Sequence, residues 1–301
     1  MGSIKDTVKK SNGKNIIEAG TLYLVATPIG NLSDITERAL KALSDADFIA
    51  AEDTRNTGKL LAYFGIRKEL VSYFEHNKRQ RGEVIVGRLK NGESCALVTD
   101  AGMPAISDPG EDIVRLCNDE GIRVSCIPGA CAAVSALALS ALATGRFAFE
   151  GFLSAAKNER RKRLDEIKHE KRTIIFYEAP HHLLETLDDL RKTFGDDRKI
   201  SLCRELTKIN EEVVRTTISG AIEEFTVRAP RGEFVLVVEG EDEYGKGMSK
   251  EENPLCALTA EEHMQYYIDN GQSKMDAIKS VAHDRKKAKS EIYKEINAKA
   301  E

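Results

Sequence analysis

The 301-residue chain has no apolar run long enough to cross a membrane, and neither sign of charge dominates it. Its longest apolar stretch, residues 130–143, is shorter than the roughly 20 residues that a membrane-spanning helix needs. The polar N-terminus has no apolar signal-peptide core. Lys and Arg total 45 against 49 Asp and Glu, and the net charge of −4 argues at first sight against a nucleic-acid partner. We expect a cytoplasmic protein with no membrane partner.

Cysteine pairs and metal-ligand patterns are also missing. The 6 cysteines form no C-x-x-C pair, and the 6 histidines show no spacing typical of a metal site. We therefore expect reduced, mostly buried thiols and no bound metal. The composition, with 41% hydrophobic and 31% charged residues, excludes a chain that is mainly disordered.

Common nucleotide-binding and hydrolase motifs are absent as well. The loop after the first expected strand keeps only Gly30 of the G-x-G-x-x-G pattern, and Pro28 removes a backbone donor there. No G-x-x-x-x-G-K-[ST] run and no G-x-S-x-G run occurs. The sequence therefore disfavours a nicotinamide-dependent dehydrogenase, a P-loop enzyme and an α/β-hydrolase.

What the chain does contain is a regular alternation of short apolar segments and amphipathic ones. The pattern predicts a first set of strands at residues 21–27, 47–51, 71–74, 94–99 and 123–127, with helices between them. It predicts a second set at 147–152, 173–177 and 199–204, then a final antiparallel pair at 212–218 and 233–239. Capping residues from Thr259 onward predict three short helices.

This alternation is typical of the α/β class with mostly parallel sheets. We expect a flexible N-terminus at 1–19, an N-terminal α/β domain at 20–128, a second α/β domain at 129–241, a linker at 242–254 and a C-terminal helical domain at 255–301.

Polar loops follow all five strands of the first set. Because the carboxyl ends of parallel strands meet at one edge, these loops should form one ligand-binding crevice. The loop at 98–110 is the most unusual, since it carries two Gly, two Pro and two Asp residues. Its Asp100 can accept a hydrogen bond and its Gly102 lets the backbone approach a ligand closely. Small residues from Ala130 to Ala133 leave further room at a helix N-terminus.

Four segments resemble the tetrapyrrole methylase superfamily of S-adenosylmethionine-dependent methyltransferases and, within it, the ribosomal RNA small subunit methyltransferase I branch. They are LYLVATPIGNLSDITERAL (22–40), AEDTRNTGKLL (51–61), LVTDAGMPAISDPG (97–110) and IPGACAAVSALALSAL (127–142). FEGFL (149–153) and IIFYEAPHHL (174–183) agree with it, so the resemblance covers about residues 20–240. The C-terminal tail also fits the branch. Tetrapyrrole-modifying members usually carry a G-x-G-x-G-D run where this chain reads ATPIGNL, and the difference argues against a tetrapyrrole substrate.

The resemblance implies two α/β domains of the tetrapyrrole-methylase type with a cofactor cleft between them, usually in a homodimer. It implies S-adenosyl-L-methionine as cofactor and, as partner, 16S ribosomal RNA in the small subunit, methylated at the 2′-hydroxyl of a cytidine. The positions that it assigns to the cofactor are Pro28, Ile29, Gly30, Asp100, Gly102, Met103, Ala130, Cys131, Tyr177, Glu178, Leu206, Gly232 and Glu233.

A ribose hydroxyl is a weak nucleophile, so a general base or hydrogen-bond acceptor should assist it. We expect Asp53 and His76, at strand ends facing the crevice, to be the catalytic residues; Glu52 and Glu75 are further candidates. A helix N-cap role for Asp53 and a purely structural role for His76 remain open. Arg55 and Asn77 are expected to position a phosphate or base of the RNA.

Two basic segments offset the acidic total. Residues 157–172 and 274–299 each contain eight Lys or Arg against four Asp or Glu, a local net charge of +4. We expect Arg160, Arg161 and Arg163 to contact RNA phosphates, with a solvated helix face as the alternative. Two other functions stay open: a methyltransferase acting on a tetrapyrrole or a protein side chain, and a non-enzymatic RNA- or ribosome-binding protein.

Overall fold

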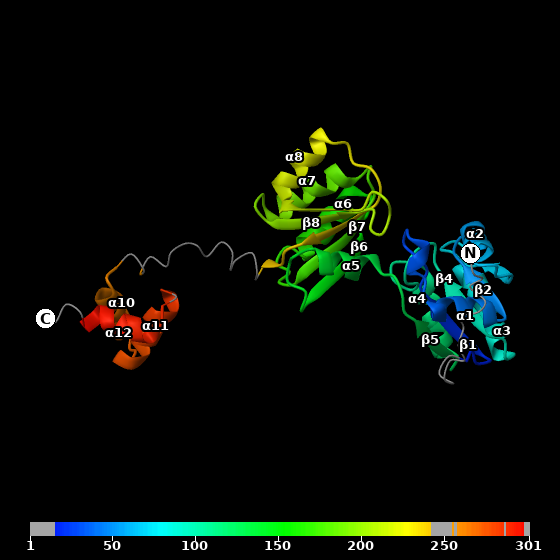
Figure 1. Cartoon of the computed structure of the whole chain (residues 1–301), viewed down its shortest axis with the longest axis horizontal. Helices are drawn as coiled ribbons and strands as arrows, with labels where there is room; N and C mark the ends of the chain where they lie inside the picture. Colours follow the sequence, from blue (N-terminus) through cyan, green and yellow to red (C-terminus); the bar gives the residue numbers. More distant parts are fainter. Residues whose placement is uncertain (1–15, 242–254, 256–257, 286, 298–301) are drawn as a thin grey trace, which may run out of the picture. The chain divides into compact units, whose positions relative to one another are not determined.

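The structure is a computed structural model that describes residues 16–241, 255, 258–285 and 287–297 (Figure 1). It divides into two units, residues 1–239 and residues 240–301, which we describe separately. The predicted linker, most of the predicted flexible N-terminus and Cys256 lie outside the described residues. Within the described ranges, no helix is both long and apolar enough to cross a membrane.

The first sheet is parallel throughout, and its central strands are buried on both faces. Its strands are β1 (Thr21–Val25), β2 (Phe48–Ala51), β3 (Glu69–Ser72), β4 (Cys95–Val98) and β5 (Arg123–Ile127). They pair in the order β3-β2-β4-β1-β5. β2 and β4 are buried along their whole length, which is typical of parallel strands covered on two sides.

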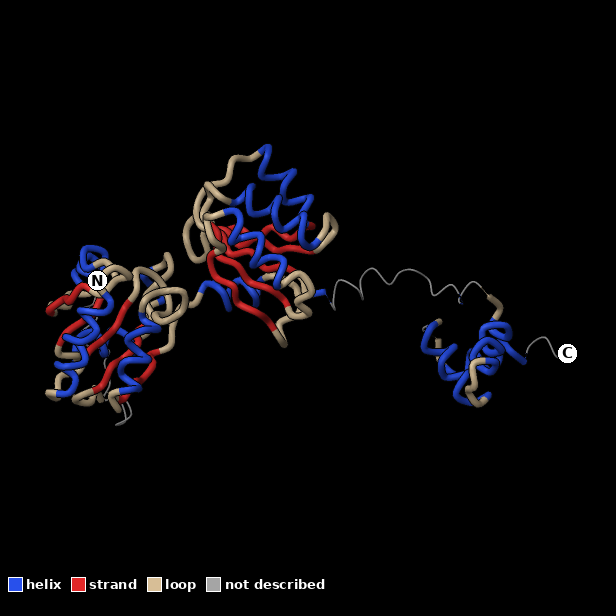
Figure 2. The backbone as a smooth tube through the Cα atoms, turned by 180° about the vertical axis from the view of Figure 1, so that it is seen from behind, coloured by secondary structure: helices blue, strands red, loops and turns tan. Residues whose placement is uncertain are grey.

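Helices cover both faces of this sheet (Figure 2). The helices are α1 (Glu37–Asp45), α2 (Thr54–Tyr63), α3 (Lys78–Lys90) and α4 (Gly110–Asp119). α1 and α2 share one hydrophobic cluster with Tyr23 and Ile49, whereas α3 and α4 share another with Leu22 and Phe48. β1 therefore leads to a helix on one face, and its neighbour β4 leads to a helix on the other. Such a change of face opens a crevice at the carboxyl ends of the two strands.

The second sheet is mixed. Its strands are β6 (Phe147–Phe152), β7 (Thr173–Glu178), β8 (Lys199–Arg204), β9 (Glu212–Thr217) and β10 (Phe234–Val238), in the order β6-β7-β10-β8-β9. β6 and β7 are parallel, while β10 runs antiparallel to both β7 and β8. The predicted pairing of the last two strands is wrong, because each pairs with β8 instead. Helix α8 (Ile218–Val227), absent from the predicted elements, connects them and carries the chain across to insert β10 between β7 and β8.

Four helices cover this sheet. They are α5 (Ala132–Leu139), α6 (Lys157–Glu166), α7 (Leu183–Phe194) and α8. α6, α7 and α8 pack on one face around Leu164, Leu187 and Phe225. α5 packs on the other face around Ala136 and Val237. That second cluster also includes Ile29 from the loop after β1, so the two sheets meet there.

The described residues of the C-terminal unit form a small three-helix bundle. Its helices are α10 (Ala260–Asp269), α11 (Lys274–Asp284) and α12 (Lys289–Asn297). Thr259 and Glu262 form a capping box at the start of α10, as the sequence predicts. A core around Met264, Ile278 and Ile292 holds the bundle together. The predicted α/β class is thus confirmed: each of two sheets is covered by helices, and a small helical module follows.

Candidate functional site

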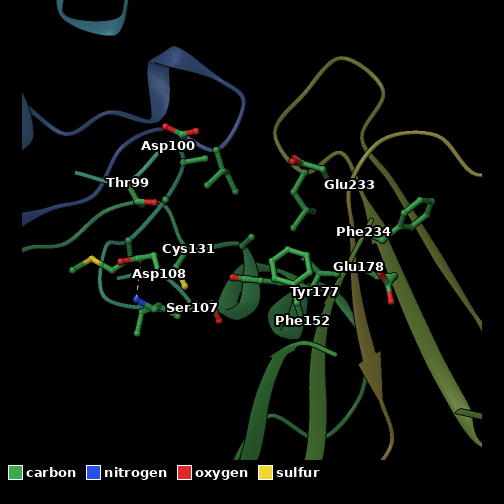
Figure 3. Close-up of a pocket in the computed structure, with 18 of the residues that line it drawn as sticks. Thr99, Asp100, Ser107, Asp108, Cys131, Phe152, Tyr177, Glu178, Glu233 and Phe234 are labelled. Atoms are coloured by element: carbon green, nitrogen blue, oxygen red, sulfur yellow. Dashed lines mark hydrogen bonds between the residues drawn. The ribbon is translucent and has the colours of Figure 1, made fainter. Parts of the chain in front are cut away.

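A cavity of about 390 Å³ lies between the carboxyl edge of the first sheet and the second sheet. Figure 3 shows Thr99, Asp100 and the Ser107–Asp108 segment on one side, and Tyr177, Glu178 and Glu233 on the other. Nine positions assigned to the cofactor by resemblance line this larger cavity: Ile29, Asp100, Gly102, Met103, Cys131, Tyr177, Glu178, Leu206 and Glu233. The volume is within the 300–1,000 Å³ typical of small-molecule sites.

A smaller cavity of about 160 Å³ adjoins the larger one, because Thr99 and Asp100 line both. Pro28 and Gly30, also assigned to the cofactor, line this smaller cavity and not the larger one. The other two assigned positions, Ala130 and Gly232, line neither cavity. Eleven of the thirteen assigned positions thus line one of two adjoining cavities, and their assignment to a cofactor stays a prediction.

The loops after β1 and β4 form the wall on the side of the first sheet. The amide of Thr27 donates to the carbonyl of Gly102 over 2.9 Å, and the amide of Gly102 donates back over 3.0 Å. Gly102 has φ of +86°, and a Cβ there would lie 3.2 Å from Ile29. A side chain at this position would therefore be strained and crowded, so glycine keeps the backbone at the cavity surface.

Asp108 holds the rest of the β4 loop in shape. Its Oδ1 accepts from the amides of Ala105 (3.0 Å) and Gly110 (2.7 Å), at the start of α4. Ala105 and Ser107 have φ of +68° and +62°, which non-glycine residues rarely adopt. Such strain concentrates at functional loops. The Asp-Pro-Gly sequence marked this loop as unusual, but nothing in it indicated the strained positions.

An aromatic wall closes the opposite side. The Tyr177 hydroxyl accepts a hydrogen bond from the amide of Ala133 at the start of α5 (3.2 Å). The rings of Phe149 and Phe152 pack against the Tyr177 ring at 5.1 and 5.4 Å. Burial raises the pKa of Tyr177 to about 12, so the phenol stays neutral. Phe152 lines the cavity and was missed, although it lies in the FEGFL segment.

The loop after β8 brings one cation into the cavity lining. Lys208 donates to Glu205 (2.8 Å) and to Glu233 (2.9 Å). A Cβ at Gly232 would come within 2.4 Å of Glu205, so glycine is required beside this group. Glu205 and Lys208 were missed because the strand-end rule was applied only to the first sheet. β8 also ends at this cavity, and the same rule applied to it would have indicated them.

The predicted base Asp53 lines neither cavity. It is the N-cap of α2, and its carboxylate accepts from the amide and the guanidinium of Arg55. These bonds hold the pKa of Asp53 well below its usual range, which makes it a poor proton acceptor. Asp53 therefore has the N-cap role that the sequence left open. Its ion-pair partner is Arg55, which was predicted to contact RNA.

His76 and Asn77 also lie outside the lining of both cavities. His76 is exposed, with its ring beside Phe74. Asn77 Oδ1 accepts from the amide of Phe74 (2.8 Å), and its Nδ2 donates to Ser72 Oγ (3.0 Å). Asn77 therefore holds the turn before α3, which argues against the predicted catalytic and RNA-positioning roles of this segment.

The carboxylates of Glu52 and Asp100 both line the larger cavity, and Asp100 also lines the smaller one. Thr99 Oγ1 donates to Glu52 over 2.7 Å. Asn56 Nδ2 donates to Asp100 Oδ2 over 3.4 Å. Burial, followed by the nearby charge of Glu52, raises the pKa of Asp100. A raised pKa makes Asp100 a better proton acceptor than Asp53.

The basic helix α6 differs from its prediction, because one of its three arginines expected to contact RNA is buried. Arg160 is 2% exposed, and its Nε donates to Asp189 over 2.9 Å. Burial removes it from any surface that RNA could reach. Arg163 is paired with Glu150, and Arg161 lies 3.6 Å from Asp189, but both are about half exposed. Among the described residues, no group of three or more His, Cys, Asp or Glu could hold a metal ion.

Comparisons with known proteins place these features in context. Residues 21–222 match the family model described as Tetrapyrrole (Corrin/Porphyrin) Methylases. A protein of Halalkalibacterium halodurans named ribosomal RNA small subunit methyltransferase I is 50% identical over 92% of this chain and 94% of its own length. The protein of the same name from Bacillus subtilis is 48% identical over 94% and 95%.

Solved structures share the fold at low sequence identity. The uroporphyrin-III C-methyltransferase of Thermus thermophilus, complexed with S-adenosyl homocysteine, has a TM-score of 0.53 and 16% identity, covering 75% of this chain and 99% of that one. The likeness supports the two-sheet fold.

Proposed function

Because the chain belongs to the ribosomal RNA small subunit methyltransferase I family of tetrapyrrole methylases, we propose that it uses S-adenosylmethionine to methylate the 2′-hydroxyl of a cytidine in 16S ribosomal RNA. One observation carries the proposal: identity of 48–50% extends over more than nine-tenths of both chains. We further propose that the protein acts on the small ribosomal subunit in the cytoplasm and that it forms a homodimer.

The lining of the larger cavity suits S-adenosylmethionine. Ile29, Met103 and the Phe152–Tyr177 aromatic pair offer apolar surface for an adenine ring. The carboxylate of Glu233 can accept a hydrogen bond from a ribose hydroxyl or an ammonium group. When bound, the cofactor supplies an activated methyl group to an attacking oxygen.

The chain's own residues must align that oxygen and take up its proton. Proximity and alignment of the reacting groups supply a large part of the rate enhancement in such transfers. Asp100 lies on the wall that both cavities share, and burial raises its pKa. We therefore assign proton acceptance from the 2′-hydroxyl to Asp100, in place of Asp53 and His76. Neutral backbone carbonyls of the β1 and β4 loops suit the sulfonium charge, which is lost during the transfer.

RNA contacts are proposed at accessible cations only. The Arg55 side chain is 85% exposed and lies on α2 beside the smaller cavity. Arg161 and Arg163 on α6 are the accessible members of the predicted basic helix. Each would contribute mainly through phosphate contacts, which dominate RNA affinity and weaken with salt.

Substrate class is the property to test first. We would supply radiolabelled S-adenosylmethionine with assembled small subunits, with naked 16S RNA, or with uroporphyrinogen III. Transfer to small subunits or their RNA is expected. Transfer to the tetrapyrrole alone would replace the proposal with the tetrapyrrole alternative. Cofactor binding without transfer to any acceptor in the panel, or no cofactor binding at all, would contradict the proposal.

A further inference from the structure

The smaller cavity has a different lining from the larger one, although a single loop separates them. Ile29 lines the larger cavity, whereas its neighbours Pro28 and Gly30 line the smaller one. Its volume of about 160 Å³ is roughly ten times the 10–15 Å³ that a single water needs. The smaller cavity therefore has room for a planar ring placed next to the larger cavity.

The lining of the smaller cavity combines apolar side chains with polar ones, which are the Thr27, Thr57 and Thr99 hydroxyls, the Asp100 carboxylate and the Asn56 amide. Leu32 and Leu60 contribute apolar surface, and Asn56 contributes the amide from the first turns of α2. Asn56 Nδ2 donates to Asp100 Oδ2 over 3.4 Å. An ionised carboxylate can only accept hydrogen bonds, so this contact favours the orientation in which the amide nitrogen faces Asp100. Oδ1 of Asn56 is thereby directed away from Asp100.

An amide held in one order can distinguish the two RNA pyrimidines. Cytosine presents an amino donor beside a ring-nitrogen acceptor, whereas uracil presents a carbonyl acceptor beside an N–H donor. The fixed pair of Asn56, Oδ1 as acceptor and the second N–H of Nδ2 as donor, complements cytosine. Uracil in the same orientation would place its carbonyl oxygen against Oδ1, acceptor against acceptor. It would also place its ring N–H against the N–H of Nδ2, donor against donor. Enzymes that modify nucleotides commonly read a flipped base by such contacts.

We propose that the smaller cavity binds the base of the acceptor nucleoside and that Asn56 selects cytosine there, with Asp100 fixing the orientation of the amide. The inference rests on the proposed function. A base in the smaller cavity brings its ribose to the wall formed by Thr99 and Asp100, next to the larger cavity. Asn56 is then a specificity-determining residue.

The test compares acceptor preference with cofactor affinity. Small subunits would carry either cytidine or uridine at the methylated position, once that position is mapped with the wild-type protein. For Asn56→Ala we expect kcat/KM on cytidine subunits to fall about tenfold to a hundredfold, and the preference over uridine to fall by a similar factor. The Kd for S-adenosylmethionine should change by less than about twofold, since Asn56 does not line the larger cavity.

Two further variants serve as references. Asn118→Ala makes the same chemical change at an exposed position near the far end of α4, and should behave as the wild type. Asn56→Asp replaces the N–H donor with a second carboxylate beside Asp100, and should lower activity on cytidine subunits at least as much as alanine does.

Two results would overturn the inference while leaving the proposed function intact. One is an Asn56→Ala protein with unchanged kcat/KM and unchanged preference for cytidine. The other is a weakened cofactor Kd with unchanged preference, which would make the smaller cavity part of the cofactor site. Failure of the wild-type protein to methylate small subunits would instead contradict the proposed function itself.

Discussion

The amide of Asn31 donates a hydrogen bond to Thr207 Oγ1 over 3.1 Å and thereby joins the loop after β1 to the loop after β8. Gly30 lies beside this bond, where a Cβ would come within 2.4 Å of Lys208 Cγ and 2.9 Å of Thr207 Oγ1. The loop after β1 lines both cavities and the loop after β8 lines the larger one, so the width of the larger cavity depends on this contact between segments 176 residues apart.

Gly30→Ala is therefore expected to push the two loops apart. We predict a Kd for S-adenosylmethionine weakened by about tenfold, measured by calorimetry, because a small displacement of positioning groups has large effects. Gly87→Ala in α3 is the matched control, since no atom lies within 4 Å of a Cβ there. It should leave the Kd unchanged and stabilise the protein by about 0.5–1 kcal/mol in urea unfolding. Wild-type cofactor affinity in Gly30→Ala would contradict the role of this contact.

The buried pair of Arg160 and Asp189 should contribute to stability and not to RNA affinity. Both side chains are 3% exposed. Arg160→Met leaves Asp189 without its principal partner, and breaking a buried pair costs about 3–5 kcal/mol. Urea unfolding measures this loss, and Arg161→Met, at a half-exposed position, should cost about 1 kcal/mol or less. An Arg160→Met protein of wild-type stability that bound subunits weakly would restore Arg160 as an RNA contact.

The two aspartates near β2 and β4 should respond differently to loss of charge. Asp53→Asn keeps an N-capping side chain on α2, so methyl transfer should stay within about threefold of the wild type. Asp100→Asn removes the assigned proton acceptor and should lower kcat by about a hundredfold or more. Single-turnover rates on small subunits measure both. A large loss in Asp53→Asn together with an active Asp100→Asn would return the catalytic role to Asp53.

The pH dependence of the rate offers an independent check on Asp100. Burial and the charge of Glu52 raise its pKa, so its reactive, ionised form is lost earlier on acidification than that of an ordinary aspartate. The single-turnover rate should therefore fall as the pH is lowered through that raised pKa, and Asp100→Asn should lack this phase. A phase of equal size in the variant would assign it to another group.

His263 makes the stability of the C-terminal bundle depend on pH. Its side chain is fully buried, its Nε2 lies 3.1 Å from Asp284, and burial lowers its pKa below 6.5. The unfolded histidine then binds a proton that the folded one does not, so stability is complete above about pH 6.5 and falls as the pH drops through the folded pKa. As the pH is lowered, backbone amide hydrogen exchange in α10 and α11 should become faster relative to exchange in α7, after correction for the pH dependence of the intrinsic exchange rates. His263→Phe should remove this difference; its persistence would identify another titrating group.

Much of the fold could be predicted because its signals are local. β2 and β4 are short, apolar and each followed by a polar loop, so they end within one residue of their predicted ends. The order of the second sheet could not be predicted, since β9 and β10 both pair with β8 and pairing is a long-range choice. The α8 crossover that separates them gave no clear periodic signal.

The site could be predicted only to the level of its loops. Asp100 and Gly102, which line the larger cavity, stand out in the sequence because a strand end and a glycine mark them, whereas Ile29 was predicted from the resemblance alone. Whether a side chain is buried or faces a cavity depends on its partners. Arg160 is buried in an ion pair with Asp189, and the Asp53 carboxylate accepts hydrogen bonds from Arg55. The Arg160–Asp189 pair joins segments 29 residues apart whose proximity is set by the fold, so charge along the sequence does not reveal it; the Asp53–Arg55 pair is local and accompanies the N-cap role that the sequence left open.

The central claim is methyl transfer to a ribose oxygen in small-subunit RNA. The most direct measurement is mass spectrometry of the nucleosides released from small subunits after reaction with S-adenosylmethionine carrying a deuterated methyl group. The account predicts labelled 2′-O-methylcytidine, at about one methyl group per subunit in the wild type and far less in Asp100→Asn. Label on a base, on a ribosomal protein or on no subunit component would contradict it.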